Sequence, residues 1–197
     1  MAGETREKIL DAAERLIQSK GLARVTTKEI ARETGLSEGA LYRHFDHKEE
    51  IFFALMMKYM PVYMDVFQTH QPGTATVKEN LTAIALGTIN YYERIVPMGA
   101  SFLGDTELLA QLRKAIQQIN GGPQNVYERV ANYIREEQQL ERMEKGISAL
   151  IIADLLLGAC FQRVFTNQFL GYDPYNKTDP LFVEELVQGL TYKLLPS

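Results

Sequence analysis

Hydrophobic residues recur along most of the chain every three to four positions, which is the period of an α-helix. In residues 5–20 one apolar face is formed by Ile9, Ala13, Leu16 and Ile17. Gly21 follows and suits the left-handed residue that often ends a helix. The two-residue alternation of a strand is nearly absent. The pattern therefore predicts an all-α protein with about nine helices.

Two short helices are predicted after the first. Thr26 and Glu29 have the spacing of a capping box, which predicts a helix that starts there and ends at Thr34–Gly35. Ser37 is the next candidate N-cap, for a third helix that extends to about His44.

These two helices have the spacing of a helix-turn-helix. A small residue at Ala31 lets the helices cross closely, and Gly35 accepts a positive φ in the turn. Leu41 is placed to fill the angle between the helices. A unit of this kind places its second helix in the major groove of DNA.

From Lys48 onward the predicted helices become longer. Pro61 is expected to kink or end the fourth helix, and a short irregular helix is expected from Pro97 to residue 104. The other long helices are predicted over residues 76–96, 105–120, 124–144, 147–170 and 180–195. This change in helix length predicts an N-terminal helix-turn-helix domain in residues 1–48 and a larger helical domain in residues 49–197.

Composition alone argues against a nucleic-acid partner. The 197 residues carry a net charge of −4, whereas DNA-binding domains are usually basic. Residues 24–48, however, hold five basic and four acidic side chains, so the acidity lies mainly outside the helix-turn-helix. This weak positive charge predicts few phosphate contacts per subunit and a reliance on dimerisation for affinity.

The sequence also favours a cytoplasmic location. Its N-terminus, MAGETREKIL, is too charged for a signal peptide, and a single cysteine, Cys160, excludes a disulfide framework. The most apolar stretch, 147–161, is interrupted by Asp154 and is shorter than the roughly 20 residues that a membrane span needs. We therefore expect no membrane partner.

The run from Thr26 to Ile51, TTKEIARETGLSEGALYRHFDHKEEI, closely resembles the DNA-binding segment of the tetracycline-repressor (TetR) family of bacterial transcriptional regulators. The most specific part is Leu-Tyr-x-His-Phe-x-x-Lys-Glu-Glu, from Leu41 to Glu50. The resemblance covers about residues 5–55, and the rest of the chain matches only in length and helical content.

The resemblance implies DNA contacts, which the chemistry of the side chains supports. Phosphate contacts are expected from Thr27, Tyr42, His44 and Lys48. Base contacts are expected from the segment that begins at Ser37, namely Gly39, Ala40 and Arg43, with Glu38 and Lys28 as weaker candidates.

Each role has a simpler alternative. Tyr42 can pack on the first helix, His44 can be structural, and Arg43 and Lys28 can be solvated charges. His44 and His47 lack a third ligand nearby, so no metal and no cofactor are expected.

For residues 49–197 the resemblance implies effector binding and dimerisation. The two last helices are more apolar than one packing layer needs, and could pair across a two-fold axis as a four-helix bundle. The predicted dimer interface consists of Leu150, Leu157, Phe182, Leu186, Leu190 and Leu194. The alternative is that these residues only fill the core of one chain.

The predicted effector pocket uses aromatic, flexible and isolated polar residues of the middle helices. They are Tyr91, Tyr92, Met98, Phe102, Tyr127, Asp154, Phe161 and Phe165. Aromatic residues at helical spacing also occur in ordinary cores, so a core role is the alternative for each.

Together these features predict a homodimeric repressor that a small, largely apolar effector releases from a palindromic operator. The first alternative is an all-α ligand-binding protein or enzyme without DNA-binding activity. The sequence lacks a Gly-rich phosphate loop, His-Glu-x-x-His and Gly-x-Ser-x-Gly, so we expect no enzyme. A second alternative is a helical scaffold that has lost DNA binding, against which the intact Tyr42, His44 and Lys48 argue.

Overall fold

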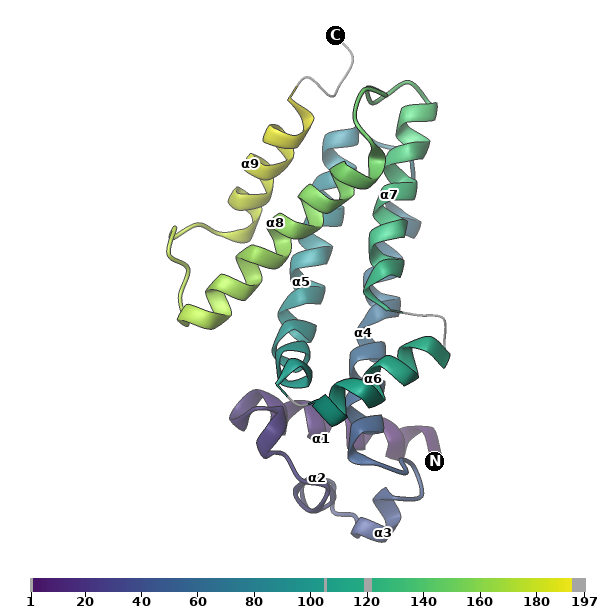
Figure 1. Cartoon of the computed structure of the whole chain (residues 1–197), viewed down its shortest axis with the longest axis vertical. Coiled ribbons are helices and arrows are strands. Elements are labelled where there is room, and N and C mark those ends of the chain that lie inside the picture. Colours follow the sequence, from purple (N-terminus) through teal and green to yellow (C-terminus); the bar gives the residue numbers. More distant parts are fainter. Residues whose placement is uncertain (1, 105, 119–121, 193–197) are drawn as a thin grey trace. The chain divides into compact units, whose positions relative to one another are not determined.

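A computed structural model describes residues 2–104, 106–118 and 122–192 (Figure 1). The described residues form helices and no strands, which confirms the all-α prediction. The helices are α1 (Ala2–Lys20), the short 3₁₀ helix η1 (Leu22–Arg24), α2 (Thr27–Thr34), α3 (Glu38–Leu41), α4 (Lys48–Thr69), α5 (Val77–Leu103), α6 (Thr106–Gln118), α7 (Pro123–Gln139), α8 (Ala149–Leu170) and α9 (Asp179–Thr191).

The helices pack as two compact units. The first unit contains the described residues of 1–60 and 94–120, and the second those of 61–93 and 121–197. Helices α4 and α5 therefore contribute to both units. The predicted boundary between residues 48 and 49 concerns function and stays a prediction.

The core of the first unit joins the helix-turn-helix to α4 and α5. Ile30 of α2 and Phe45 are buried with Phe52 of α4. Phe102 at the end of α5 belongs to the same core, and Leu112 of α6 packs against it while half-buried. The short N-terminal helices are thus stabilised by residues far beyond position 48.

Neither proline ends its helix, so the helix end predicted before Pro97 is wrong. Of the two outcomes expected at Pro61, a kink or an end, the end is wrong. A proline removes one hydrogen bond to the carbonyl four residues earlier. For Pro97 that carbonyl belongs to Glu93, and the Gln168 side chain donates a hydrogen bond to it at 3.0 Å. Beyond Pro61 the same helix buries Tyr63, whose packing favours continuation.

Helix α7 ends at Gln139, about one turn earlier than predicted. The chain turns at Glu141, whose φ is +60°. The Gln138 amide donates to the carbonyls of Glu144 and Ile147, at 2.9 Å each, and holds this turn. These hydrogen bonds join residues 6 and 9 positions apart, which is not the spacing of a helix. The sequence pattern therefore did not indicate that α7 ends early.

Helix α8 is the main core helix of the second unit. Ile152, Leu156 and Cys160 are buried along one side, and α7 and α9 both pack against the helix (Figure 1). With 22 residues, α8 extends beyond the most apolar stretch, 147–161, and by length and composition the whole helix is apolar enough to cross a membrane. The core helix of a soluble protein meets the same criterion, and almost half of this segment is buried within the chain.

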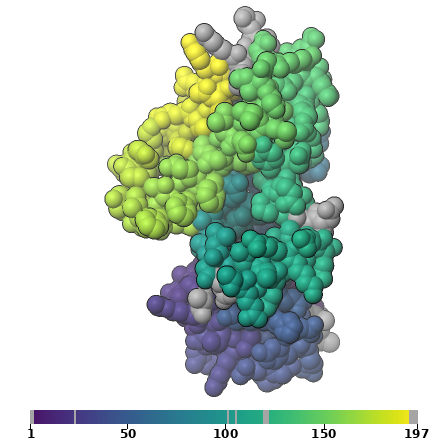
Figure 2. Space-filling view, viewed as in Figure 1, coloured from purple at the N-terminus to yellow at the C-terminus, as the bar shows by residue number. Residues whose placement is uncertain are grey.

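One buried arginine fixes the loop between α8 and α9, whose surfaces lie side by side in Figure 2. Arg163 donates from Nε to Asp179 at 2.6 Å and from Nη2 to the carbonyl of Lys177 at 2.7 Å. Its guanidinium also lies 3.4 Å from Asp173 and stacks over the Phe182 ring. These contacts set where α9 begins.

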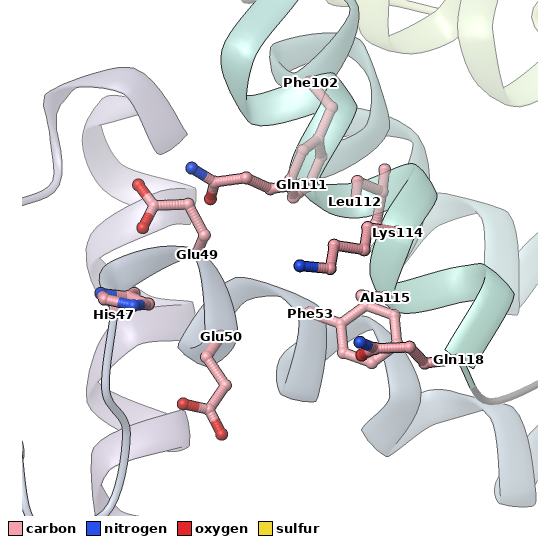
Figure 3. A pocket seen from close by; sticks show the side chains of 10 residues that line it. All are labelled: His47, Glu49, Glu50, Phe53, Phe102, Gln111, Leu112, Lys114, Ala115 and Gln118. Carbon is pink, nitrogen blue, oxygen red and sulfur yellow. The ribbon is translucent and has the colours of Figure 1, made fainter.

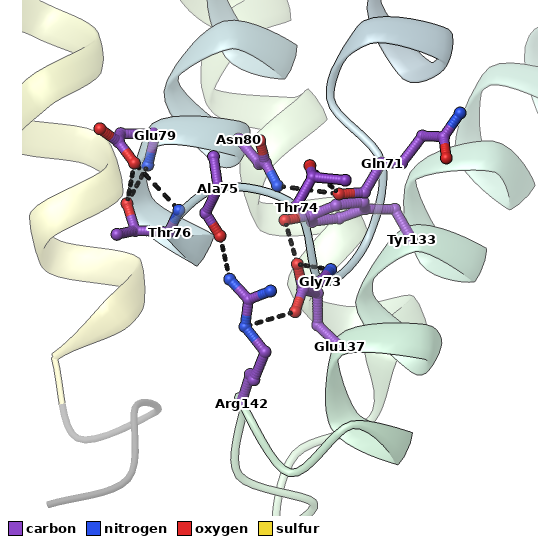
Figure 4. A network of polar contacts seen from close by, with 10 residues as sticks. All are labelled: Gln71, Gly73, Thr74, Ala75, Thr76, Glu79, Asn80, Tyr133, Glu137 and Arg142. Carbon is purple, nitrogen blue, oxygen red and sulfur yellow. Dashed lines mark hydrogen bonds and ion pairs between the residues drawn. The ribbon is translucent and has the colours of Figure 1, made fainter.

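A buried carboxylate links α7 to the loop that precedes α5 (Figure 4). Glu137 accepts hydrogen bonds from the Tyr133 hydroxyl at 2.8 Å and from the Gly73 N–H at 3.3 Å. Arg142 forms an ion pair with the second oxygen at 3.3 Å and donates to the Ala75 carbonyl. The charge of Glu137 is therefore compensated although the residue is fully buried.

Candidate nucleic-acid interface

The start of α2 is fixed by a complete capping box, as predicted. Thr26 accepts a hydrogen bond from the Glu29 N–H at 3.3 Å, and the Glu29 carboxylate accepts one from the Thr26 N–H at 3.0 Å. Lys20 forms an ion pair with Glu29. The hydrogen bonds from Lys20 and Thr26 lower the pKa of Glu29 from 4.5 to about 2. The carboxylate is thus charged in its structural role at neutral pH.

The turn between α2 and α3 has the geometry that its residue types predict. Gly35 adopts a left-handed conformation with φ +71°, and the Leu36 N–H bonds to the Ala31 carbonyl at 2.9 Å. Leu41 of α3 is buried and belongs to the same core cluster as Ile30 of α2. The local structure is therefore a helix-turn-helix.

The expected recognition helix is shorter than predicted. Helix α3 is capped by Ser37, whose Oγ accepts from the Ala40 N–H at 3.1 Å, and it ends at Leu41 instead of His44. Residues 42–44 continue as turns. Tyr42 and Arg43 thus extend from a turn that directly follows the helix.

Most of the predicted DNA contacts lie on the surface of this unit. Lys28, Ser37, Glu38, Gly39, Tyr42 and Arg43 are exposed, and Thr27, Ala40, His44 and Lys48 are half-buried. A side chain added at Gly39 would meet open space, so the backbone there is accessible to a partner. All of these residues except Lys48, which begins α4, lie on α2, on α3 with its cap Ser37, or in the turn after α3.

Two of the predicted phosphate contacts are neighbours. The Thr27 hydroxyl lies 3.3 Å from the Tyr42 hydroxyl and 3.5 Å from a carboxylate oxygen of Glu38. Both hydroxyl groups can donate to one acceptor. The adjacent carboxylate would repel a phosphate unless the Glu38 side chain moves away.

The fourth helix begins next to this surface. The Glu50 carboxylate accepts from the Asp46 N–H at 2.8 Å, and the Lys48 ammonium lies 5.4 Å from the centre of the Phe52 ring. The positive end of the α4 dipole and the Lys48 ammonium both attract anions, which is the chemistry that the predicted phosphate contact requires, although Glu49 and Glu50 lie in the same first turn.

Sequence reasoning missed one basic residue of this unit. The exposed Arg6 of α1 places its guanidinium 4.8 Å from the centre of the Phe45 ring. Phe45 lies 39 positions later in the chain. No periodic pattern relates two residues so far apart, so the contact had no signal in the sequence.

The residues predicted for a dimer interface are mostly not on the open surface. Leu157 is buried in the core of its own chain, while Leu150, Phe182, Leu186 and Leu190 are half-buried. Leu194 lies outside the described residues. A different set of large apolar side chains is exposed on α8 and α9: Ile151, Leu155, Phe161, Phe165, Phe169 and Leu181. The four-residue spacing from Phe161 to Phe169 was the signal that could have identified them.

The predicted effector residues divide between the two units. Met98 and Phe102 are buried in the core of the first unit. The other six belong to the second unit: Tyr91, Tyr92, Tyr127, Asp154, Phe161 and Phe165. Within the second unit, Asp154 is exposed and the Tyr127 hydroxyl donates to the Leu150 carbonyl at 3.0 Å.

Four of these residues form a row of aromatic contacts. Tyr91, Tyr92, Phe161 and Phe165 follow one another with ring centres 5.9–6.0 Å apart. The row begins in the core, where burial raises the pKa of Tyr91 to about 12, and it reaches the exposed side of α8.

The described residues meet neither the requirements of a metal site nor those of a cysteine nucleophile. They contain no group of three or more His, Cys, Asp or Glu side chains that could hold a metal ion. Cys160 is buried with its Sγ 3.7 Å from the Ala85 carbonyl, and burial raises the pKa of its thiol to about 12. A protonated, buried thiol is a poor nucleophile.

Comparison with known sequences relates this surface to a bacterial family. The model described as "Bacterial regulatory proteins, tetR family" matches residues 9–55. The nucleoid occlusion factor SlmA of Haemophilus ducreyi is 36% identical over 89 residues, which are 45% of this chain and 42% of that protein. The HTH-type transcriptional regulator TtgR of Pseudomonas putida is 46% identical over 55 residues, which are 28% of this chain and 26% of that protein. The matched parts thus span less than half the length of these two relatives.

A third relative matches over most of its length. SlmA of Marinobacter nauticus is 30% identical over 167 residues, which are 82% of this chain and 80% of that protein.

Solved structures share the whole fold at low identity. A putative TetR-family regulator from Mesorhizobium loti superposes with a TM-score of 0.78 at 16% identity, covering 100% of this chain and 99% of that one. SmeT, the repressor of the Stenotrophomonas maltophilia multidrug efflux pump SmeDEF, superposes with a TM-score of 0.70 at 20% identity, covering 98% and 91%.

Proposed function

Because this chain belongs to the TetR family of bacterial regulatory proteins, we propose that it is a dimeric transcriptional repressor that binds a palindromic DNA operator in the cytoplasm. The observation that carries the proposal is the paired hydroxyl groups of Thr27 and Tyr42 on an exposed helix-turn-helix. A DNA phosphate accepts hydrogen bonds from hydroxyl groups, and such contacts fix the register of the protein on the duplex.

The other proposed DNA contacts follow from exposure and chemistry. Lys48 and the first N–H groups of α4 attract a second phosphate. Arg43 is exposed, and its guanidinium can donate two hydrogen bonds to a guanine. Gly39 allows the backbone to approach the bases, and the Ala40 methyl group suits a thymine. His44 adds a phosphate contact, and Lys28 and Glu38 are the weaker candidates for base contacts.

Dimerisation is supported by the exposed apolar side chains of α8 and α9. An isolated chain would leave Ile151, Leu155 and Phe165 about half exposed. Two copies that pair these helices across a two-fold axis would bury them in a four-helix bundle. The half-buried Leu150, Phe182, Leu186 and Leu190 would border that bundle. Two recognition helices would then reach half-sites about 34–36 Å apart.

In this proposal residues 1–48 read the DNA, and residues 49–197 dimerise and bind the effector. The effector is small and largely apolar, and its binding lowers the affinity for DNA by the coupling free energy between the two sites. The row of aromatic residues around Tyr92 is one apolar surface available for such a molecule.

A mobility-shift assay with the DNA upstream of the protein's own gene tests the proposal. We expect a salt-sensitive, sequence-selective shift with two chains per operator, because phosphate contacts release counterions. The absence of any selective shift across salt concentrations would contradict the proposal and favour a helical ligand-binding protein without DNA activity.

A second candidate function is nucleoid occlusion. It is favoured by the match to SlmA of Marinobacter nauticus, which extends over 80% of that protein. Chromatin immunoprecipitation separates the two functions. A repressor should occupy a few sites beside regulated genes, whereas an occlusion factor should occupy many chromosomal sites and block cell division when overproduced.

A further inference from the structure

The first unit contains a hollow of about 400 Å³ between the first turns of α4, the last turn of α5 and helix α6 (Figure 3). This volume lies within the usual range of about 300–1,000 Å³ for small-molecule sites. Its apolar walls are provided by Phe53 of α4, Phe102 of α5, and Leu112 and Ala115 of α6. The hollow can therefore bind an apolar group close to the proposed DNA-binding surface.

The helix that covers the hollow is only partly buried. None of the described side chains of α6 is fully buried, although its apolar face is directed toward the core of the unit. Leu112 and Ala115 remain half-buried. A molecule bound in the hollow would bury its own apolar surface together with that of Leu112 and Ala115, which is favourable.

Two opposite charges face the hollow without neutralising each other. Glu49 of α4 and Lys114 of α6 both line it from different helices, and Figure 3 shows the Lys114 ammonium directed into the space between the helices and the Glu49 carboxylate at its edge, on the side of the Gln111 amide. Among the described residues, neither side chain has a hydrogen-bond or ion-pair partner. Glu50, the neighbouring acid, is already engaged by the Asp46 N–H.

We propose that this hollow is a binding site for a zwitterionic amphiphile, a molecule with an apolar body and adjacent ammonium and carboxylate groups, such as an amino acid with a large apolar side chain. The apolar body would contact Phe53, Phe102 and Leu112, the ammonium would pair with Glu49, and the carboxylate would pair with Lys114. An amine would leave Lys114 without a partner, and a carboxylic acid would leave Glu49 without one.

The regulatory part of this inference rests on the proposed function. Glu49 directly follows Lys48, which is a proposed phosphate contact, and the hollow is bounded by the same turns of α4. A ligand that fits the hollow better in one arrangement of α4 and α6 than in another shifts the protein toward that arrangement. DNA affinity and ligand affinity must then change by the same factor.

Binding is tested on the full-length protein without DNA, by isothermal titration calorimetry. The probes are L-phenylalanine, phenethylamine and 3-phenylpropanoate, which share one apolar body and carry both charges, the positive charge only and the negative charge only. We expect L-phenylalanine to bind about tenfold tighter than either other probe, because each charged hydrogen bond adds affinity. Equal binding of the three probes, or no binding of L-phenylalanine, would overturn the proposal.

Two conservative variants test which side chain pairs with which charged group of the ligand. Glu49→Gln should remove the advantage of L-phenylalanine over 3-phenylpropanoate, and Lys114→Gln should remove its advantage over phenethylamine. Lys78→Gln, an exposed lysine of the second unit, is the matched control and should change nothing. Ala115→Trp should fill the hollow and abolish binding of all three. Since the two charge variants alter only side chains at the mouth, they decide the question even if Ala115→Trp does not fold.

A mobility-shift assay with and without L-phenylalanine then tests the regulation. We expect at least about a fivefold change in the protein concentration that shifts the operator, and no change for Lys114→Gln. Calorimetric binding with no operator shift at all would contradict the proposed repressor function and leave the binding site standing. Calorimetric binding with an operator shift that L-phenylalanine leaves unchanged would overturn the regulatory part of the inference. A DNA shift without calorimetric binding would overturn the site and leave the repressor standing.

Discussion

The Thr27 hydroxyl at the start of α2 lies 3.3 Å from the Tyr42 hydroxyl in the turn after α3. This pair joins the two segments that a helix-turn-helix presents to DNA. Tyr42 is 45% exposed, so its hydroxyl is available to a phosphate as well as to Thr27.

We expect Tyr42→Phe to weaken DNA binding about tenfold on operator and unrelated DNA alike, because a hydrogen bond to a charged phosphate contributes about 1.5 kcal/mol and carries no sequence information. Fluorescence anisotropy with both DNAs measures the effect. Tyr175→Phe, an exposed tyrosine of the loop before α9, is the control. A loss confined to the operator would show that Tyr42 reads bases instead.

Arg43 and Lys48 should differ in what they contribute. Arg43→Ala is expected to relax the preference at one base pair, at a cost of about 1–3 kcal/mol, since a bidentate contact to guanine is lost. Lys48→Ala should weaken binding uniformly and reduce the salt slope by about one. Binding to an operator library at several salt concentrations checks both. An unchanged base preference in Arg43→Ala would contradict the proposed role.

How far the sequence predicts the structure depends on how local each interaction is. The capping box of Thr26 and Glu29 was predicted because both partners lie within one helical turn. The continuation of α5 through Pro97 was not, because the Glu93 carbonyl finds its partner in Gln168, 75 positions later. Helix ends that depend on distant side chains leave no periodic signal.

The candidate sites follow the same rule. The helix-turn-helix residues are close in sequence, so their grouping on one surface was predictable. Helix α8 is apolar on nearly every side, and the pattern could not show that Leu157 is buried while Leu155 is exposed. Met98 lies seven residues from Tyr91 on the same helix but belongs to the other unit, which only tertiary packing reveals.

The carboxylate of Glu29 should make the stability of the helix-turn-helix depend on pH. Its pKa is about 2 in the folded chain against 4.5 ordinarily, so its stabilising contribution is present above about pH 4.5 and is lost as the pH falls toward 2. Glu29→Gln should lower the melting temperature at neutral pH, and its difference from the parent should shrink at about pH 3 and below. Glu144→Gln, an exposed acid outside any capping box, should show no such convergence. A constant difference at all pH values would assign the effect to packing.

Arg163 should be the critical residue for the placement of α9. Arg163→Ala leaves Asp173 and Asp179 without their cation, and removal of one partner of a buried pair costs about 3 kcal/mol. Arg163→Lys should recover only part of the loss, because lysine lacks the planar fork. Urea unfolding measures the change. Arg135→Ala removes a surface ion pair with Glu128 and should cost under about 1 kcal/mol. Similar losses for both alanine variants would contradict the structural role of Arg163.

The exposed side of α8 should control the oligomeric state. Phe165→Glu places a charge on a side chain that is 45% exposed in the single chain, so it should leave the fold intact but make a paired interface unfavourable. We expect sedimentation velocity to show a monomer, and operator affinity to fall because each half-site is then bound alone. Leu155→Glu, on the same side of α8, should act alike, whereas Val62→Glu, at an exposed position of α4, should remain dimeric. If both α8 variants sediment as the parent protein does, α8 lies outside the dimer interface and the four-helix arrangement is wrong.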